Sequence, residues 1–208
     1  MQSRQIPDIV VGRLPLYLRA LQRMGEEGRQ LTSSQELGER LGISAAQIRK
    51  DLSQFGEFGK QGTGYTIEYL CEQLQKILNV DRTWDIAVIG AGDIGSAVAR
   101  YQGFANRGFK VALLFDNDSE KIGTKIGEFT VQDIAGLEPN IRRNGILLAM
   151  IAVPGSHAQE VADRLVESGV KAILNYAPLS LNVPHGVHVQ YIDPAVHLQR
   201  MTYYLDDK

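Results

Sequence analysis

Three glycines in the middle of the chain have the spacing of a phosphate-binding turn. Gly90, Gly92 and Gly95 follow an apolar, β-branched run at 86–89 and precede helix-forming residues at 96–100. In such a turn the first glycine permits a tight bend, the second lets the backbone approach a pyrophosphate, and the third lets the helix pack closely on the strand. The helix N-terminus offers free N–H groups and a positive dipole to the phosphates. The predicted dinucleotide-binding turn consists of Gly90, Ala91, Gly92, Asp93, Ile94 and Gly95.

An acidic residue ends the next apolar run. Asp116 lies 21 residues after Gly95, a position from which a carboxylate accepts hydrogen bonds from a ribose 2′-OH. Its neighbours Asn117 and Asp118 are not basic, so a 2′-phosphate would meet repulsion, although Lys121 is a contrary sign. The pattern favours NADH and NAD⁺ over the phosphorylated coenzymes. The alternative is that Asp116 is only a turn residue at a strand end.

Two later strand ends are candidates for the nicotinamide side of the site. The apolar run 146–153 ends at Val153 and Pro154, and the run 170–176 leads into Ala177 and Pro178. In parallel α/β sheets, ligands bind beyond the carboxyl ends of the strands. Val153 and Pro154 are therefore predicted to contact the coenzyme, on position alone.

From residue 84 on, the pattern alternates between strands and helices. Continuous apolar strands indicate a parallel sheet covered on both faces, and right-handed crossovers make it a doubly wound, Rossmann-like sheet. We expect this α/β domain over residues 81–192. The predicted strands are 85–90, 110–116, 146–153, 170–176 and 187–192, and the predicted helices lie near 94–107, 131–138 and 157–168.

The first eighty residues have the pattern of a helix-turn-helix. A stripe of leucines predicts a helix over residues 14–24, and Ser33 with Glu36 forms a capping box at the start of a second helix. Gly42 ends that helix, and Ser44 caps the next one, which runs to residue 52. Arginine and glutamine can reach base edges in the major groove, and lysine and serine can hold phosphates. The predicted DNA-binding residues here are Ser34, Gln47, Arg49, Lys50 and Ser53.

A glycine-rich stretch at 55–65 follows the helix-turn-helix. Its four glycines, one lysine and several aromatic residues predict a two-stranded wing whose tip approaches a sugar-phosphate backbone. Lys60, Gly62 and Tyr65 are the predicted contacts. We expect a winged-helix DNA-binding domain over residues 1–80. The alternative is a small helical packing domain with a glycine-rich loop, because Gly38 stands where such motifs usually have a buried alanine.

The end of the chain, residues 193–208, is predicted to be a helix with Asp193 in the cap position and Pro194 in its first turn. Its apolar stripe is too extensive for a free tail, so it needs a groove on its own subunit or on a partner. The stripe consists of Val196, Leu198, Met201, Tyr204 and Leu205.

Composition sets the class of protein. Of the 208 residues, 44% are hydrophobic and 22% charged, the balance of a globular protein. The net charge is −2, so a nucleic-acid partner must be argued from local placement. The single cysteine excludes an internal disulfide framework and a cysteine-built metal site. Without a long apolar run or a signal peptide, we expect a cytoplasmic protein that binds neither membrane nor metal.

Catalysis is not expected. Hydride transfer to a carbonyl commonly needs a poised proton donor, and none of the four histidines stands in a recognisable catalytic arrangement. The nucleotide domain is also small and has no second substrate domain. Two alternatives stay open, namely a small NAD-dependent oxidoreductase with an accessory helical domain, and a Rossmann domain that binds coenzyme A or another adenine nucleotide. The histidines, each expected at the surface or in packing, are His157, His185, His188 and His197.

Several motifs occur in a fixed order along nearly the whole chain. They are Arg13–Tyr17, the helix-turn-helix at 34–52, the wing at 55–59, the glycine turn at 90–95, Phe115-Asp116, the stretch 121–123 and the ending around Asp193. As an ordered set they resemble the Rex family of redox-sensing transcriptional repressors.

The resemblance implies a homodimeric winged-helix repressor whose Rossmann domain binds NADH and NAD⁺ competitively. Binding of NADH would release it from palindromic, double-stranded operator DNA, so that it responds to the cellular NADH/NAD⁺ ratio. The resemblance also implies that the C-terminal helix is swapped between subunits and serves dimerisation. Arg13, Tyr101 and Asp193 of the other subunit are then a polar relay between the nicotinamide and the DNA domain, with Tyr101 also in the coenzyme site.

Overall fold

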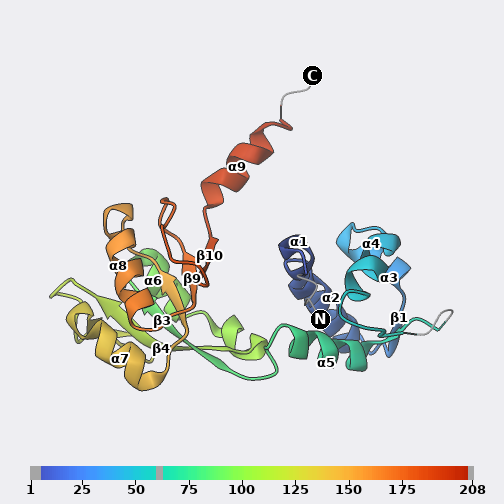
Figure 1. Ribbon diagram of the computed structural model, residues 1–208, viewed down its shortest axis with the longest axis horizontal. Helices are drawn as coiled ribbons and strands as arrows, with labels where there is room; N and C mark the ends of the chain where they lie inside the picture. Colours follow the sequence, from blue (N-terminus) through green and yellow to red (C-terminus); the bar gives the residue numbers. More distant parts are fainter. Residues whose placement is uncertain (1–5, 60–62, 206–208) are drawn as a thin grey trace. The chain divides into compact units, whose positions relative to one another are not determined.

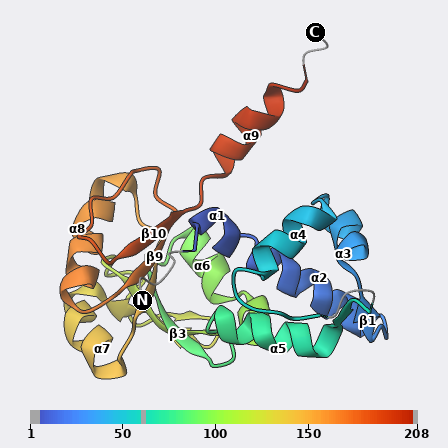
Figure 2. The ribbon, with the colours of Figure 1, turned by 45° about the vertical axis from the view of Figure 1, so that its right-hand side comes forward.

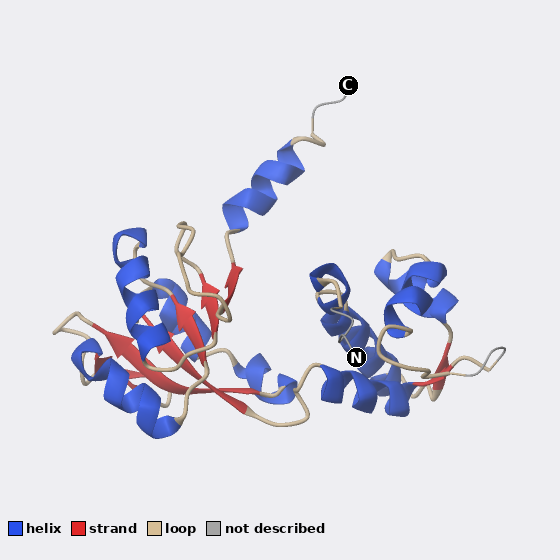
Figure 3. Cartoon of the chain, in the orientation of Figure 1, coloured by secondary structure: helices blue, strands red, loops and turns tan. Residues whose placement is uncertain are grey.

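The computed structural model describes residues 6–59 and 63–205, and the chain forms two compact units, Met1–Arg82 and Thr83–Lys208. The first unit is mainly helical and the second is built on a parallel sheet (Figure 3). Among the described residues, no helix is both long and apolar enough to span a membrane.

The first unit packs its helices around one apolar core. Its elements, labelled in Figure 1, are α1 (Asp8–Val11), α2 (Leu14–Glu26), β1 (Leu31–Thr32), α3 (Ser34–Leu41), α4 (Ala45–Leu52), β2 (Tyr65–Thr66) and α5 (Ile67–Ile77). In the shared core of the two short helices, Leu37, Ile48 and Leu52 are buried, and Leu41 and Ile43 are partly buried against them. The predicted helix-turn-helix is confirmed.

Local capping chemistry fixes where these two helices begin. The Ser33 hydroxyl accepts a hydrogen bond from the Glu36 N–H at 3.1 Å, and the Ser44 hydroxyl accepts one from the Gln47 N–H at 3.2 Å. The Glu36 carboxylate accepts from the Thr32 hydroxyl at 3.0 Å. Ser33 therefore acts as the predicted N-cap, while Glu36 also ties the helix to the strand before it.

Gly38 explains how closely α3 approaches the turn that follows it. A methyl group on its Cα would overlap the carbonyl oxygen of Ile43, and the Ile43 N–H donates back to the Gly38 carbonyl at 3.0 Å. The backbone leaves no room for the alanine usual at this position. Glycine in place of the usual alanine therefore reflects a tighter turn, and it is compatible with a helix-turn-helix.

Replacing Gly38 with alanine is expected to destabilise the first unit by about 1–3 kcal/mol, the usual cost of overpacking a fixed backbone contact. Thermal unfolding followed by circular dichroism would measure this loss. The comparison variant is Gly28→Ala, where an added methyl meets nothing within 4 Å among the described residues. Gly28 lies at a positive φ of 81°, so this variant measures the cost of backbone strain without a steric overlap. Unchanged stability in Gly38→Ala would show that the turn can open.

The strand pairing at the predicted wing differs from the two-stranded hairpin that the sequence predicted. Of the described residues in 55–65, only Tyr65 lies in a regular strand, and β2 pairs antiparallel with β1, which precedes the helix-turn-helix. The wing is therefore not a hairpin paired within 55–65, as far as the described residues show. The glycines at its base keep the chain close to Tyr65, since a methyl at Gly59 would meet the Tyr65 ring.

The second unit is a six-stranded parallel sheet in the order β10-β9-β8-β3-β4-β7. This is the 6-5-4-1-2-3 order of dinucleotide-binding domains, so the predicted Rossmann-like sheet is confirmed. Its strands are β3 (Trp84–Ile89), β4 (Phe109–Asp116), β7 (Gln132–Asp133), β8 (Leu148–Ile151), β9 (Ala172–Asn175) and β10 (His188–Tyr191), with a separate hairpin of β5 (Lys125–Ile126) and β6 (Phe129–Thr130).

Alternate residues of the strands face two different cores. In β3, Ala87 and Ile89 pack with helices α7 (Leu137–Asn144) and α8 (Gly155–Glu167). Ile86 and Val88 pack with Ala99 of helix α6 (Asp93–Ala99) on the other face. Helices therefore cover both faces of the sheet, as the continuous apolar strands predicted.

Two predicted helices of this unit differ from the structure by more than a turn. The helix expected at 94–107 stops at Ala99, and a 3₁₀ segment, η1 (Gln102–Arg107), follows an extended Tyr101. The helix expected at 131–138 was wrong in its first half, because Gln132 and Asp133 pair with the end of β4. A short 3₁₀ segment, η2 (Ile134–Gly136), then leads into α7. A strand of two residues is too short to show a period.

The C-terminal helix α9 (Pro194–Thr202) follows β10, an edge strand of the sheet (Figure 2). Asp193 caps it as predicted, since its carboxylate accepts from the Ala195 N–H at 2.9 Å. No residue of this helix is buried in the chain. The apolar side chains of its predicted stripe, Val196, Leu198, Met201, Tyr204 and Leu205, are 57–76% exposed.

Candidate functional site

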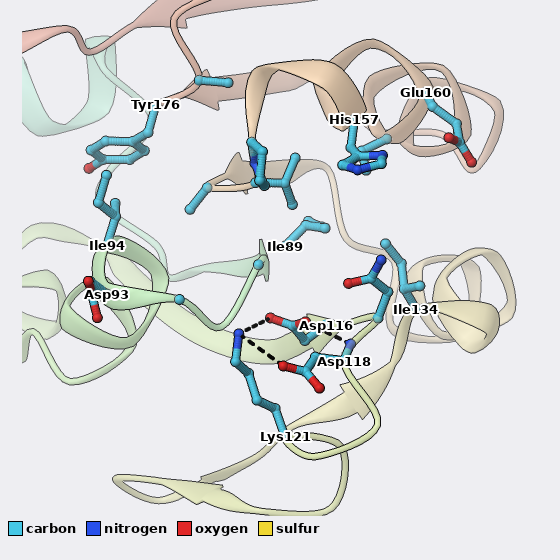
Figure 4. A pocket seen from close by; sticks show the side chains of 18 of the residues that line it. Ile89, Asp93, Ile94, Asp116, Asp118, Lys121, Ile134, His157, Glu160 and Tyr176 are labelled. Carbon is cyan, nitrogen blue, oxygen red and sulfur yellow. Dashed lines mark hydrogen bonds and ion pairs between the residues drawn. The ribbon is translucent and has the colours of Figure 1, made fainter.

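A cavity of about 590 Å³ opens at the carboxyl ends of β3, β4, β8 and β9. It lies where the strand order reverses, the usual ligand position in such sheets. Figure 4 shows side chains converging on it from both sides of the sheet edge. The predicted coenzyme residues that line it are Gly90, Gly92, Asp93, Ile94, Asp116, Val153 and Pro154.

Three predicted coenzyme residues do not line the cavity. Ala91 and Gly95 are buried in and beneath the glycine turn. Tyr101 is 49% exposed and packs edge-on against Phe104, with ring centroids 4.9 Å apart. Ala91 and Gly95 thus shape the turn, and in this structure Tyr101 makes a different contact from the one predicted.

The three glycines of the turn are required for different reasons. Gly90 has a φ of +100°, and a methyl there would lie 2.6 Å from the carbonyl oxygen of Ala152. A methyl at Gly95 would overlap the carbonyl oxygen of Gly90. A methyl at Gly92 would meet nothing within 4 Å among the described residues. The fold itself demands glycine at 90 and 95, whereas at 92 the bare backbone faces open space that a ligand can enter.

Asp116 links the end of β4 to the glycine turn. One carboxylate oxygen accepts from the Ala91 N–H at 2.6 Å and the other from the Asp118 N–H at 2.9 Å. Burial alone would raise the pKa of Asp116, but these N–H groups and nearby Lys121 hold it below its usual range. Asp116 is therefore an ionised acceptor at the cavity edge, and it also serves the turn role considered as the alternative.

Lys121 does not leave an unopposed positive charge at this edge. Its Nζ lies 3.6 Å from carboxylate oxygens of both Asp116 and Asp118 (Figure 4). Two carboxylates surround one ammonium, so the local charge is negative overall. Lys121 therefore does not make this edge favourable for a 2′-phosphate, which was the objection that its position in the sequence raised.

The far end of the cavity contains residues that sequence patterns did not single out. Ile134 follows β7, and His157 lies in the first turn of α8 beside Glu160 (Figure 4). Arg164 fixes this end, because it pairs with Glu138 and donates to the Ile134 carbonyl at 2.7 Å. His157 was expected at the surface or in packing, and it is exposed, at a place where it also lines the cavity. Helix α8 begins at Gly155, two residues before the predicted helix.

The predicted DNA-binding residues differ in their exposure. Arg49, Lys50 and Ser53 are exposed on and just after α4. Ser34 is instead buried, and its hydroxyl accepts from the Arg49 guanidinium at 2.8 Å. The structure thus makes Ser34 a support for Arg49.

Gln47 and Tyr65 are half-buried. The Gln47 amide donates to Asp51 at 2.7 Å, and the pKa of Tyr65 is raised by burial. Lys60 and Gly62 lie outside the described residues.

A buried carboxylate on α4, absent from the sequence prediction, organises this unit. Asp51 is 1% exposed and accepts two hydrogen bonds from Arg13, at 2.6 and 2.8 Å. Tyr17 donates to it at 2.6 Å and Gln47 at 2.7 Å. Burial alone would raise the pKa of Asp51, but these four hydrogen bonds from three side chains hold it below the usual range. The Arg13–Asp51 ion pair is bidentate, which is the strong geometry for an arginine and a carboxylate.

The three predicted switch residues have separate partners in this chain. Arg13 pairs with Asp51, Tyr101 packs against Phe104, and Asp193 caps α9. The predicted relay requires Asp193 of a second subunit, so it stays a prediction.

Comparisons with known proteins cover both units. Residues 5–53 match the family described as "Putative DNA-binding protein N-terminus", and residues 81–179 match the one described as "CoA binding domain". The redox-sensing transcriptional repressor Rex of Roseiflexus sp. (strain RS-1) is 56% identical over 199 residues, 96% of this chain and 90% of that protein. Rex of Carboxydothermus hydrogenoformans is 44% identical, covering 98% of both chains.

Solved structures agree with these matches. RSP in complex with β-NAD⁺ and operator DNA has a TM-score of 0.92 at 39% identity, covering 97% of this chain and 93% of that one. RSP in complex with β-NADH has a TM-score of 0.88 at 38% identity, covering 96% and 94%. These relatives are transcriptional repressors and not enzymes. With a helix-turn-helix, a dinucleotide-type sheet and relatives of this identity along its whole length, the chain belongs to the Rex family of redox-sensing transcriptional repressors.

Proposed function

We propose that this chain represses transcription by binding palindromic operator DNA as a homodimer and leaves the DNA when NADH binds its Rossmann unit. The observation that carries the coenzyme site is the open space above Gly92 beside the ionised Asp116. NAD⁺ would occupy the same cavity without releasing the DNA. Because its partner is operator DNA, the protein would act in the cytoplasm.

The coenzyme has a natural orientation in the cavity. Its pyrophosphate would lie on the turn at 90–95, at the N-terminus of α6, and Asp116 would accept from the adenosine ribose. The adenine then points toward Ile134 and His157, and the nicotinamide points toward Val153 and Pro154. All four residues line this cavity.

The DNA readers would be the exposed side chains of α4. Arg49, Lys50 and Ser53 are available for bases and phosphates. A dimer presents two such helices, which match half-sites about 34–36 Å apart or a multiple of that. The exposed apolar stripe of α9 supports dimerisation, because a helix exchanged with a second subunit would bury it.

Release by NADH must follow from linkage. A ligand shifts an equilibrium only through different affinities for the two states, and a swing from 1:99 to 99:1 needs about 5.5 kcal/mol of difference. NADH and NAD⁺ differ at the nicotinamide, by one positive charge and by ring shape. The groups that distinguish them must therefore lie at the nicotinamide end of the cavity.

Coenzyme A is the second candidate ligand, favoured by the description of the family that matches residues 81–179. It carries a phosphate on its adenosine ribose, as NADPH does. At that place the cavity has Asp116 and Asp118 around a single Lys121, which disfavours both ligands.

NADPH and coenzyme A are expected to bind at least about tenfold more weakly than NADH, because an added phosphate faces like charge at this edge. Calorimetric titrations of one protein sample with the three ligands would measure the difference. Equal affinity for NADPH would contradict the assigned role of Asp116 and its neighbours.

The function as a whole is tested by binding the purified protein to a palindromic operator duplex in the presence of each coenzyme. NADH should release the protein, and NAD⁺ should leave it bound. Equal release by both, or by neither, would contradict the proposed function.

A further inference from the structure

Asn175, the last residue of β9, is a buried polar side chain that neither the glycine turn nor the DNA unit uses. It is 1% exposed. Its amide nitrogen donates to the carbonyls of Ala177 at 3.1 Å and Leu179 at 2.9 Å, and its amide oxygen accepts from the Ala177 N–H at 3.0 Å. One side chain therefore satisfies three main-chain groups of the turn that follows its own strand.

That turn is a wall of the cavity. Tyr176, Ala177 and Pro178 all line it. In Figure 4, Tyr176 lies near Ile94 at one end, whereas His157 lies at the other. β9 is on the β8 side of the central strand β3, and Asp116 is on the β4 side. With the adenosine at Asp116, the Asn175 turn borders the nicotinamide.

The chemistry of the turn requires an amide. Two carbonyl oxygens each need a donor and one N–H needs an acceptor, and only asparagine or glutamine offers two N–H donors and an acceptor on one neutral group. A carboxylate of the same shape could accept from Ala177 but would face the Ala177 and Leu179 carbonyls with negative charge. An apolar residue would leave all three groups without this partner.

The same residue also holds the end of the neighbouring strand. The Asn175 carbonyl accepts from the Ile192 N–H at 2.9 Å, one residue before the cap of α9. The Tyr191 hydroxyl accepts from the Leu181 N–H at 2.9 Å, on the far side of the turn. The cavity wall and the start of the C-terminal helix therefore share one anchor.

We propose that Asn175 is the positioning residue for the nicotinamide end of the cavity, and that it sets the discrimination between NADH and NAD⁺. The inference rests on the proposed function, since it assigns the ligand of that cavity. Asn175 acts through the backbone of residues 176–179, which it holds at a fixed distance from the ring.

The test is Asn175→Asp, titrated with NADH, NAD⁺ and ADP-ribose, which lacks the nicotinamide ring. NADH affinity should fall about tenfold or more, the loss expected when a buried donor is removed, and the ratio of NADH to NAD⁺ affinity should move toward one. ADP-ribose affinity should stay within about threefold of the unaltered protein. The matched control is Asn182→Asp at an exposed site nearby, which should change none of the three.

Retained ADP-ribose binding shows that the variant is folded. An equal loss for ADP-ribose and NADH would overturn the inference, as would unchanged NADH affinity. The milder Tyr191→Phe removes the second tie of the turn and should reduce NADH affinity in the same direction, again without loss of ADP-ribose; no effect there on NADH contradicts the proposed wall. If the unaltered protein itself fails to bind NADH, the proposed function fails and not this assignment.

Discussion

Replacing Gly92 with alanine is expected to weaken NADH binding by about 1–3 kcal/mol, a factor of about 5–150, while leaving the protein folded. An added methyl meets no described atom of the chain within 4 Å, and the backbone at Gly92 is extended, at φ −77° and ψ −164°, which alanine adopts freely. The methyl would instead occupy the space that the pyrophosphate must enter. Calorimetry gives the affinity, and thermal unfolding should show a loss of at most about 1 kcal/mol from the changed helix cap.

The comparison variant is Gly95→Ala in the same turn. Its methyl would overlap the Gly90 carbonyl oxygen, so it should lower the stability of the second unit together with NADH binding. If Gly92→Ala binds NADH as well as the unaltered protein does, the pyrophosphate does not lie on this turn.

Replacing Asp51 with alanine is expected to destabilise the first unit by about 3 kcal/mol, as in other cases where one partner of a buried ion pair is removed. Arg13, Tyr17 and Gln47 all lose their acceptor, and α4, which carries the proposed DNA readers, loses its tie to α2. Operator binding should fall with the stability. NADH binding should stay unchanged, because its proposed site lies wholly in the second unit.

The matched control is Asp8→Ala, an exposed aspartate of the same unit. It should cost no more than about 1 kcal/mol, the largest usual value for an acid in the first turn of a helix. Equal effects of the two substitutions would show that burial and pairing of Asp51 contribute nothing.

The Asp51 contacts also predict a direction of pH dependence. The folded pKa lies below the usual range, so the contribution is complete above the unfolded pKa of about 3.9 and is lost as the pH falls through the folded value. Asp51→Asn should flatten this acid loss in unfolding experiments. An acid limb identical to that of the unaltered protein would mean that other carboxylates cause it.

Local chemistry made much of the fold predictable. Ser33 and Ser44 cap helices through hydrogen bonds to residues three positions away. The spacing of the three glycines at 90–95 predicts a phosphate-binding turn. Continuous apolar runs predicted the parallel strands, because a strand covered on both faces must be apolar throughout. These signals need no knowledge of distant segments.

The missed features depend on distant or very short contacts. Asp51 meets Arg13 and Tyr17 across 38 and 34 residues of sequence, so nothing local distinguishes it from a surface aspartate of α4. β7 is defined only by its pairing with β4. Asn175 lies within the predicted apolar run 170–176, but the three hydrogen bonds of its amide depend on the path of the turn that follows. No residue of α9 is buried in this chain, and the second subunit proposed to cover its apolar stripe leaves no local signal in the sequence.

In the proposed mechanism, NADH binds on the glycine turn and thereby causes the protein to leave its operator. The direct measurement is operator occupancy, by fluorescence anisotropy, as NADH is titrated against the unaltered protein and against Gly92→Ala. Since coupling between two ligands is reciprocal, the NADH concentration for half-release should rise in Gly92→Ala by the same factor as its NADH dissociation constant. Weakened NADH binding with an unshifted release curve would contradict the account.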